Sequence, residues 1–543
     1  MLRPRAYLVL LAALAAPALL GAPAASAATP LPVGWPSHLA LGMSDVEHGA
    51  ADLRATTPLE VRYHYLAGGV NTGQGWTGWA NGDGSFVTQY VTDSQAAGFL
   101  PVFSLYQLRQ SQPGIGNPDE AQGDLLNLRT RETMRAFFTE LQTFYRLAAV
   151  SGGPVYLHVE PDLWGYAQVA TEGSDDATTV PAKVAATGIP ALKGLPNTVA
   201  GVAQAIVRLR NDLAPNVMLG YHLSIWGTGV DIARSDASDT HVDELSSRSA
   251  VFYRSLGADF DVVFAEFADR TPGYAKDVSD DGGGWWDAAD FTRHARYMGI
   301  VSSRLNRRVI LWQIPLGNRV MRTVNNTPFH YQDNRVEWLL GGESPQHLTP
   351  YENAGVIGLL FGSAQATDTC ACDAAGDGVT NPAAINGNDL VSSSTDDDGG
   401  YFRRRAGAYY AAGPRKLPAA VTRPSKAKRR KHPPVLRMRT TTDRPAVRRG
   451  RRIIVSVRIH ALEPASTLVA VQLYRPGARR PTYQLPFRGE HFRKDRPRRL
   501  RLRFDVPAAA PTGTWRVKVG VFDPDWKRLY LWSEHAAQFE VRR

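Results

Sequence analysis

Short apolar runs of strand length recur through residues 38–362, and between them lie longer segments with apolar residues three or four positions apart. The eight short runs occupy residues 38–45, 59–65, 99–106, 154–160, 216–224, 260–267, 308–315 and 355–362. The spacing in the longer segments predicts helices, at residues 131–150, 197–213, 291–307 and 399–413. Eight strands that each lead into a helical or loop segment predict a (β/α)8 TIM barrel. An open doubly wound sheet is disfavoured, because no Gly-x-Gly-x-x-Gly follows the first strand.

The end of the chain follows a different pattern. Residues 435–543 contain runs that alternate apolar and polar residues, such as residues 513–523, between Pro, Gly and Asp turns. This period of two predicts an all-β sandwich of the immunoglobulin-like type. Residues 415–543 also carry 33 Lys and Arg against 9 Asp and Glu, although the net charge of the whole chain is +11. We therefore expect a barrel over residues 28–414, an extended basic linker over residues 415–434, and a β-sandwich after it.

The N-terminus predicts export. Arg3 and Arg5 precede an apolar run, and Ala-Ser-Ala stands before Ala28. This is the form of a signal peptide with its cleavage site, so we expect residues 1–27 to be removed. The mature protein is expected to be secreted and extracellular, or loosely associated with the cell wall. No second apolar run is long enough to predict a membrane span.

Carboxylates stand at the ends of two predicted strands. Glu160 ends the fourth strand within residues 154–162, and Glu266 and Asp269 end the sixth. In a TIM barrel the C-terminal ends of the strands surround the active site. Cleavage of a glycosidic bond needs one carboxyl group to protonate the leaving oxygen and a second to attack the sugar or activate water. We predict catalysis by Glu160 and Glu266, with Asp269 as a substitute for Glu266 and Asp162 as a neighbour that tunes Glu160.

Aromatic and polar side chains accompany these carboxylates at the predicted strand ends and in the loops that follow them. Aromatic rings offer flat apolar faces, which suit the faces of sugar rings. We predict that the substrate site is lined by Asp162, Trp164, His222, Trp226, Trp76, Trp79, Trp285, Trp286, Trp312, Gln313 and Tyr106. The alternative for the tryptophans is packing within their own loops.

With a predicted barrel, a Glu at the end of strand four and aromatic loops, the sequence resembles the secreted bacterial glycoside hydrolases of the TIM-barrel type. The resemblance implies cleavage of an extracellular polysaccharide with Glu160 as general acid/base. In the largest clan of retaining barrel glycosidases the nucleophilic Glu ends strand seven, where this chain has Gln313. Strand six is therefore expected to supply the partner. Val-Glu-Pro-Asp at residues 159–162 is similar to a strand motif of cellobiohydrolase-type barrels, and residues 512–541 resemble the immunoglobulin-like accessory modules of bacterial cellulases.

Several alternatives stay open. Glu160 could pair with Arg62 inside the barrel, which would make it structural. Gln313 keeps open a non-catalytic carbohydrate- or cell-wall-binding protein on a barrel scaffold. A metal-dependent polysaccharide esterase is a third hypothesis. No spacing around His158 and His222 matches a metal motif, so we expect no catalytic metal and no cofactor.

The loop after the eighth strand is acidic and rich in glycine. Its oxygens could bind a structural Ca²⁺ without the EF-hand spacing, through Asp373, Asp377, Asn386 or Asn388. Cys370 and Cys372 in the same loop could form a local disulfide or two free thiols.

The basic C-terminal module predicts a partner of opposite charge. Its arginines favour an anionic cell-wall polymer or an acidic polysaccharide. Nucleic acid is disfavoured as a partner, because the chain is expected to be secreted and shows no recognised nucleic-acid fold. We expect a monomer.

Overall fold

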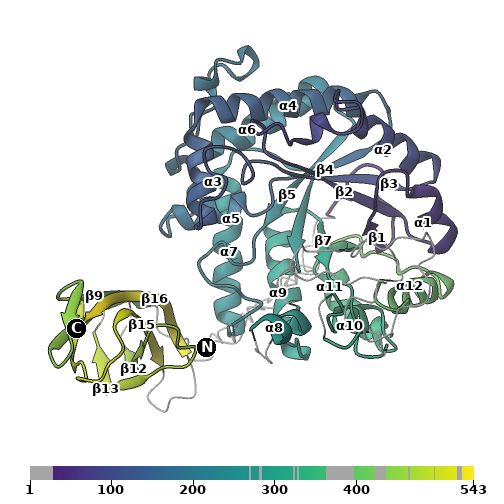
Figure 1. The fold of residues 1–543 in the computed structure, drawn as a ribbon. Coiled ribbons are helices and arrows are strands. Elements are labelled where there is room, and N and C mark those ends of the chain that lie inside the picture. Colours follow the sequence, from purple (N-terminus) through teal and green to yellow (C-terminus); the bar gives the residue numbers. More distant parts are fainter. Residues whose placement is uncertain are drawn as a thin grey trace, which may run out of the picture. The chain divides into compact units, whose positions relative to one another are not determined.

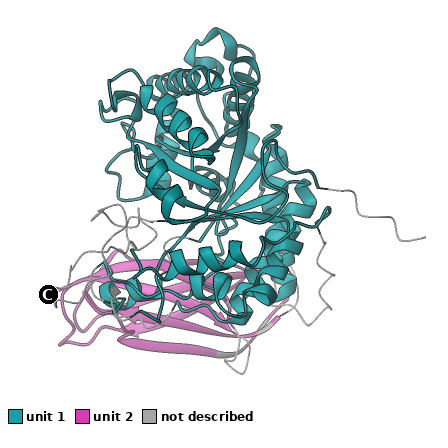
Figure 2. Cartoon of the chain, turned by 90° about the vertical axis from the view of Figure 1, so that its right-hand side faces the viewer, with its two compact units in different colours: residues 1–427 teal, residues 428–543 magenta. Residues whose placement is uncertain are grey.

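The computed structural model describes residues 29–235, 237–267, 271–279, 284–321, 324–326, 329–362, 397–421, 436–462, 465–493, 496–522 and 529–543 (Figure 1). The chain divides into two compact units, Met1–Ala427 and Lys428–Arg543 (Figure 2). Each unit is described below by itself. Among the described residues, no helix is both long enough and apolar enough to cross a bilayer.

The first unit is a closed barrel of eight parallel strands in the order of the chain, with β1 paired to β8. The strands are β1 (Ala40–Ser44), β2 (Val61–Ala67), β3 (Leu100–Tyr106), β4 (Val155–Val159), β5 (Val217–Leu223), β6 (Val262–Glu266), β7 (Val309–Ile314) and β8 (Val356–Phe361). Each strand lies within or beside one of the eight predicted runs, so the predicted (β/α)8 barrel is confirmed. The runs are continuous rather than alternating because both faces of a parallel barrel strand are buried.

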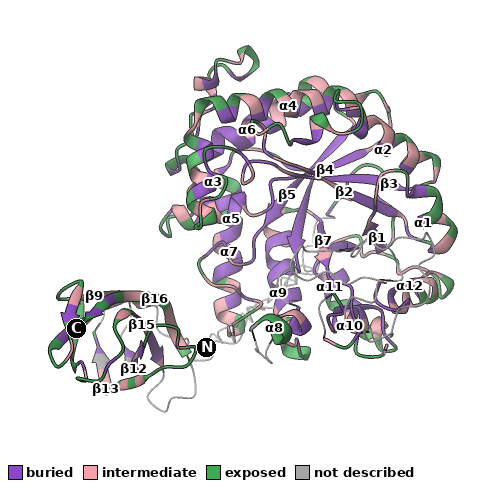
Figure 3. Ribbon diagram, in the orientation of Figure 1, coloured by how far each residue is buried: buried purple, intermediate pink, exposed green. Residues whose placement is uncertain are grey.

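Helices surround the barrel, with their apolar faces toward the strands (Figure 3). The α-helices are α1 (Ala50–Thr56), α2 (Ser85–Ala96), α3 (Glu120–Arg129), α4 (Arg131–Ala149), α5 (Leu163–Ala170), α6 (Val199–Leu213), α7 (Asp239–Ser255), α8 (Pro272–Ser279), α9 (Ala288–Leu305), α10 (Arg335–Leu340), α11 (Ser344–Asn353) and α12 (Tyr401–Ala411). Short 3-10 turns occur at η1 (Trp76–Gly78), η2 (Ala177–Thr179), η3 (Ala185–Thr187) and η4 (Pro190–Leu192). The four predicted helices correspond to α4, α6, α9 and α12.

The barrel interior is filled by side chains rather than open. Inward residues from alternating positions form one cluster that includes Val61, Tyr63, Tyr156, Phe264 and Trp312. Large aromatic residues in the centre make the barrel a packed core. Ligands therefore have access only at the ends of the barrel.

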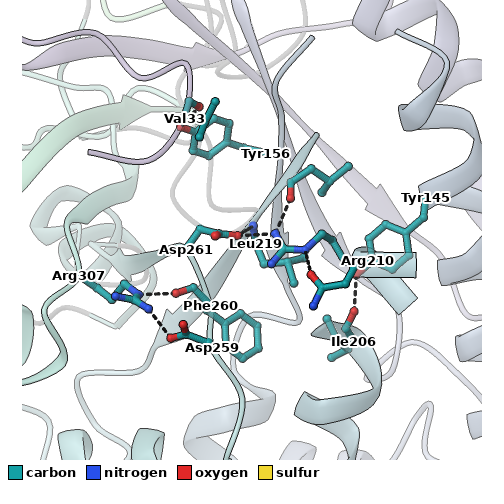
Figure 4. Close-up of polar contacts among 12 residues, drawn as sticks. Val33, Tyr145, Tyr156, Ile206, Arg210, Leu219, Asp259, Phe260, Asp261 and Arg307 are labelled. Carbon is teal, nitrogen blue, oxygen red and sulfur yellow. Dashed lines mark hydrogen bonds and ion pairs between the residues drawn. The ribbon is translucent and has the colours of Figure 1, made fainter. Parts of the chain in front are cut away.

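At the N-terminal end of the strands, polar groups are tied to one another. Asp261 precedes β6 and accepts hydrogen bonds from Arg210 Nη1 at 2.6 Å and from the backbone N–H of Leu219 at 2.7 Å (Figure 4). Arg307 donates to the carbonyl of Phe260 at 2.6 Å. Trp35 closes this end and donates its indole N–H to the carbonyl of Ile357. This end of the barrel is sealed by ion pairs and packing.

The start of the predicted linker belongs to the barrel, which corrects the expectation that all of it is extended and exposed. Residues 415–421 cross the N-terminal end of the barrel, where the N–H of Leu417 donates to Ser37 at 3.1 Å. Arg308 donates to the carbonyls of Pro418 and Ala419 at 2.7 and 3.1 Å. Backbone hydrogen bonds to barrel residues hold this stretch in place despite its basic, Pro-rich composition.

The second unit consists of two sheets around an apolar core, which confirms the predicted C-terminal all-β fold. One sheet has the order β10-β16-β15-β12-β13 and the other β14-β11-β9. The strands are β9 (Leu436–Thr442), β10 (Ala446–Arg448), β11 (Arg452–Ala461), β12 (Ala465–Tyr474), β13 (Tyr483–Phe492), β14 (Arg498–Asp505), β15 (Gly513–Phe522) and β16 (Leu529–Arg542). Trp515 is buried in the core between them.

Candidate active site

Three ionisable side chains meet at the C-terminal end of the barrel strands. Glu266 is the last residue of β6, His222 lies near the end of β5, and Asp162 lies in the turn between β4 and α5. One oxygen of each carboxylate and one ring nitrogen of His222 lie within 4.8 Å of one another. Nε2 of His222 is 3.6 Å from Oε2 of Glu266. His222 is fully buried, Glu266 is 6% exposed and Asp162 is half-buried, so the cluster lies where the barrel interior meets the mouth.

A chain of hydrogen bonds leads from this cluster into the barrel. Nδ1 of His222 lies 2.9 Å from Nε2 of His158, and Nδ1 of His158 lies 3.1 Å from Oγ of Ser104. Burial, and then the neighbouring His222, hold the pKa of His158 well below its usual value. The neutral form of the imidazole is therefore favoured at the inner end of the chain.

Aromatic side chains pack against both histidines. The ring of Phe264 stacks on His158 with 4.4 Å between centroids, and Trp312 meets both histidines edge to face. Gly220 makes room for this stack, because a Cβ there would lie 2.4 Å from the ring of Phe264. A side chain at this position would displace the ring that orients His158.

The backbone takes up unusual conformations where two strands reach the mouth. Glu160 has φ of 45°, Asp162 has φ of 72° and Gln313, on β7, has φ of 53°. Positive φ values cost free energy in residues other than glycine, and such residues cluster at functional sites. These turns redirect the side chains at the ends of β4 and β7.

Glu160 occupies a different place from the one predicted. Its carboxylate is 1% exposed and accepts hydrogen bonds of 3.1–3.3 Å from the backbone N–H groups of Gln107 and Leu108, after β3. Burial, and then the nearby Asp124, raise the pKa of Glu160 well above its usual value. Glu160 is not part of the cluster with Glu266, whereas Asp162, predicted only to tune it, is. The structural alternative with Arg62 does not apply either, because Arg62 pairs with Asp45 at 2.5 Å.

Aromatic side chains lie around Asp162 at the rim. Tyr106 and Tyr166 are half-buried, and burial, followed by the charge of Asp162, raises the pKa of both hydroxyls. The ring of Trp226 lies 5.0 Å from that of Tyr166. Tyr106 and Trp226 were predicted here, whereas Tyr166 was not singled out, although its position four residues after Asp162 on α5 was a usable signal.

On the other side of the mouth, Gln313 donates its side-chain amide to the hydroxyl of Tyr65. Tyr65 packs against Trp312 with 5.6 Å between ring centroids. Trp312, which was predicted to line the substrate site, is instead 2% exposed and packs inside the barrel against His158 and His222. Gln313 was a predicted site residue. Tyr65 was not, although it ends a predicted strand.

Several predicted sugar-binding tryptophans are core residues, which corrects their assignment. Trp164 and Trp76 are fully buried and donate their indole N–H groups to the carbonyl of Val159 at 2.9 Å and to Gln107 at 3.2 Å. Trp286 is 4% exposed and packs between aromatic side chains. A ring without an exposed face has nothing to offer a sugar.

Two other predicted tryptophans are half-buried. Trp79 packs against Phe86 with 5.3 Å between ring centroids. Trp285 lies under the guanidinium of Arg319 at 5.4 Å. These two retain partly exposed faces.

Some predictions lie outside the described residues. They concern Asp269, the two cysteines Cys370 and Cys372, and the suggested calcium ligands Asp373, Asp377, Asn386 and Asn388. The signal peptide at residues 1–27 lies outside them as well.

The cluster also has the composition of a metal site. Two carboxylates and one imidazole suit Zn²⁺ or another first-row divalent metal. Nε2 of His222 is buried and makes no hydrogen bond to a described residue. When Nδ1 of His222 donates to His158, Nε2 of His222 carries a free lone pair on the side of the carboxylates. The hydrogen bond to His158 then fixes the orientation of the His222 ring.

Comparisons with known proteins add little to this geometry. No protein-family model matches the sequence, and no curated protein matches it with significance. Similar solved structures include β-glucuronidase 2 of Bacteroides uniformis bound covalently to cyclophellitol-6-carboxylate aziridine (8% identity, TM-score 0.35, 93% of this chain and 46% of that chain). They also include a β-glucosidase of Listeria innocua with isofagomine (10%, 0.16, 61% and 41%) and the C-terminal domain of Wzt (6%, 0.17, 20% and 71%).

This chain thus spans less than half the length of the two glycosidase chains. At these TM-scores the likenesses carry no argument about activity. The class of the protein is therefore defined by its own fold and site: a TIM barrel with two carboxylates and a histidine at the C-terminal end of its strands.

Proposed function

We propose that this protein is a secreted glycoside hydrolase that cleaves an extracellular polysaccharide with Asp162 and Glu266 as its two catalytic carboxylates. The observation that supports this best is the approach of their oxygens to within 4.8 Å at the C-terminal end of the barrel. Retaining glycosidases hold their two carboxyl groups about 5 Å apart, and inverting ones about 6.5–9.5 Å apart. The separation therefore favours retention of configuration.

The roles of the two carboxylates follow from their neighbours. Glu266 lies beside His222 at the buried end of the cluster. As general acid it would give its proton to the leaving oxygen, and as general base it would regain one from the water that hydrolyses the glycosyl-enzyme. We assign Glu266 as general acid/base. Asp162, in the strained turn after β4 and nearer to solvent, is the nucleophile that forms the glycosyl-enzyme. Glu160 then supports the site by fixing the loop after β3.

The rim is suited to a sugar polymer. Tyr106 and Tyr166 lie near Asp162, and Trp226 packs against Tyr166. Tyr65 and Gln313 lie across the mouth with hydroxyl and amide groups for sugar hydroxyls. We propose internal cleavage of the polymer, because aromatic groups on both sides of the carboxylates provide contacts for sugars on both sides of the scissile bond.

The experiment is a screen of the purified protein against glucans, mannans, galactans, arabinans, chitin and acidic polysaccharides. We expect release of reducing ends from one class, as oligosaccharides, and NMR of the first product should show the anomeric configuration of the substrate. Asp162→Asn and Glu266→Gln should each abolish release. Glu160→Gln should lower stability, and its activity per folded molecule should fall less than that of either variant. Full activity of Asp162→Asn would overturn the assignment.

A metal-dependent hydrolase, such as a polysaccharide esterase, is the second candidate. It is favoured by the buried Nε2 of His222, which faces the two carboxylates. A chelator followed by dialysis distinguishes the two functions. Glycoside hydrolysis by the carboxylates should survive chelation, whereas an activity lost on chelation and restored by Zn²⁺ would establish the metal-dependent function instead.

A further inference from the structure

The three-stranded sheet of the second unit presents arginines on its outer face. Along β11 the residues from Ile453 to Ala461 alternate between the core and the outside. The outward positions of the three strands carry six exposed arginines, which we call the arginine face: Arg437 and Arg439 on β9, Arg458 on β11, and Arg499, Arg501 and Arg503 on β14.

The strand register aligns these arginines into a row. Arg458 lies directly opposite Arg499 on one side and directly opposite Arg439 on the other. Neighbouring strands are about 4.8 Å apart, so the three charges span about 10 Å across the sheet. Two residues along, Arg501 lies opposite Ser456, which lies opposite Thr441.

Such a row is unfavourable in the absence of a partner. Like charges directly opposite each other destabilise a sheet. None of the six arginines forms an ion pair with a described residue. In the other sheet, by contrast, Lys518 pairs with Glu534 and Arg542 pairs with Glu540. The arginine face therefore gathers on one surface six arginines that form no ion pair with a described residue.

We propose that the arginine face binds an acidic polysaccharide. Guanidinium groups bind carboxylates through paired N–H donors, and a row of them suits a polymer with regularly spaced anions. Ser456 and Thr441 add hydroxyls beside Arg501, which match sugar hydroxyls. Single-stranded nucleic acid binding uses aromatic stacking platforms, and the described outward positions of these strands carry no Phe, Tyr or Trp.

The anionic nature of the partner rests on the arginine face alone. The choice of a polysaccharide rests in part on the proposed function, since the same chain would then hold and cleave a polymer. Binding can therefore be tested with a catalytically silent chain, so that failure of one proposal is distinguishable from failure of the other.

The test uses the full chain carrying Asp162→Asn and Glu266→Gln, with polygalacturonate as the probe and dextran as the neutral control. We expect retention by polygalacturonate that weakens as NaCl rises from about 50 to about 200 mM, because salt screens exposed charges. Combining Arg439→Gln, Arg458→Gln and Arg499→Gln should weaken binding about tenfold, since each exposed contact contributes a factor of about two to three. The melting temperature of this triple variant should be equal to or higher than that of the parent chain.

A matched variant controls for net charge. Arg448, Arg475 and Arg480 are exposed arginines of the same unit outside the arginine face, and their combined change to Gln removes the same charge. It should leave affinity within about twofold. Equal losses in both triple variants would show attraction by net charge and overturn the proposal, as would binding to dextran. Tighter binding of duplex DNA or of anionic phosphatidylserine vesicles than of polygalacturonate at equal salt would overturn the choice of polysaccharide.

Discussion

The carboxylates at the two ends of the barrel have opposite kinds of neighbours. At the N-terminal end Asp261 is bound by Arg210 and by a backbone N–H, so its charge is matched. At the C-terminal end Asp162 and Glu266 approach each other and share His222. Two like charges at such a distance disfavour joint ionisation. The base of the barrel is therefore tied together by paired charges, whereas the proposed function assigns the carboxylates at the mouth to catalysis.

The largest effect is expected at the mouth. Glu266→Gln keeps the shape of the side chain and removes the proton that the leaving group needs, so kcat should fall by about 10³-fold or more. The melting temperature should change little, because removal of one of two opposed carboxylates relieves repulsion. Kinetics and thermal melts of this variant check the expectation. A large fall in the melting temperature, with activity per folded molecule unchanged, would reverse the roles of the two ends.

At the base the effect should fall on stability. Asp261→Ala removes the negative charge beside Arg210 and the acceptor of the N–H of Leu219, and we expect a loss of about 2–3 kcal/mol in the free energy of unfolding. Urea denaturation measures this loss. Activity per folded molecule should be unchanged, and a fall in kcat comparable to that of Glu266→Gln would erase the contrast between the ends.

The pH dependence of stability should reveal the environment of a third carboxylate, Asp124, which is buried on α3. Burial raises the pKa of Asp124 from 3.8 to about 7. The folded protein then binds a proton that the unfolded chain has released, so stability contributed by this group is present below pH 4 and is lost as pH rises toward 7, by about 1.4 kcal/mol per pH unit at most. Asp124→Asn should flatten this decline in urea titrations between pH 4 and 7. An unaltered slope would show that another group is responsible.

The smallest effect is expected at the rim. Trp226 is half-buried beside Tyr166, so Trp226→Ala should remove a sugar contact while it spares the core. We expect KM to rise about fivefold to tenfold with kcat within about twofold, as for loss of binding that is equal in ground and transition states. Trp35→Ala, at the sealed end, is the matched control and should lower the melting temperature without raising KM.

The sequence was sufficient for the architecture because its strands are buried on both faces. All eight apolar runs became parallel barrel strands, and the alternation after residue 435 became two sheets. Each pattern is a local consequence of which faces meet solvent. The start of the linker was misjudged, since backbone hydrogen bonds, which composition does not encode, hold residues 415–421 to the barrel.

The site was predicted only in part. The sequence named Glu266 and His222, which the structure brings together, because they lie at or near the ends of regular strands, where a period of two sets the direction of a side chain. The same rule failed at Glu160 and Asp162, because positive φ values turn the chain as it leaves β4. Trp164 and Trp76 were placed at the rim, although both are buried: Trp164, on α5, packs against Tyr221 and Phe260, and Trp76 packs against Phe144.

By itself, the order of apolar and polar residues determined that this chain forms a barrel followed by a β-sandwich, and which strand ends bear acids. Only the tertiary structure decided that Asp162 rather than Glu160 meets Glu266, and that Arg439, Arg458 and Arg499 stand in one row. The physical reason is the same in both cases. Periodicity states which side of an element a residue occupies, whereas turn geometry and strand register set which residues of different elements come together.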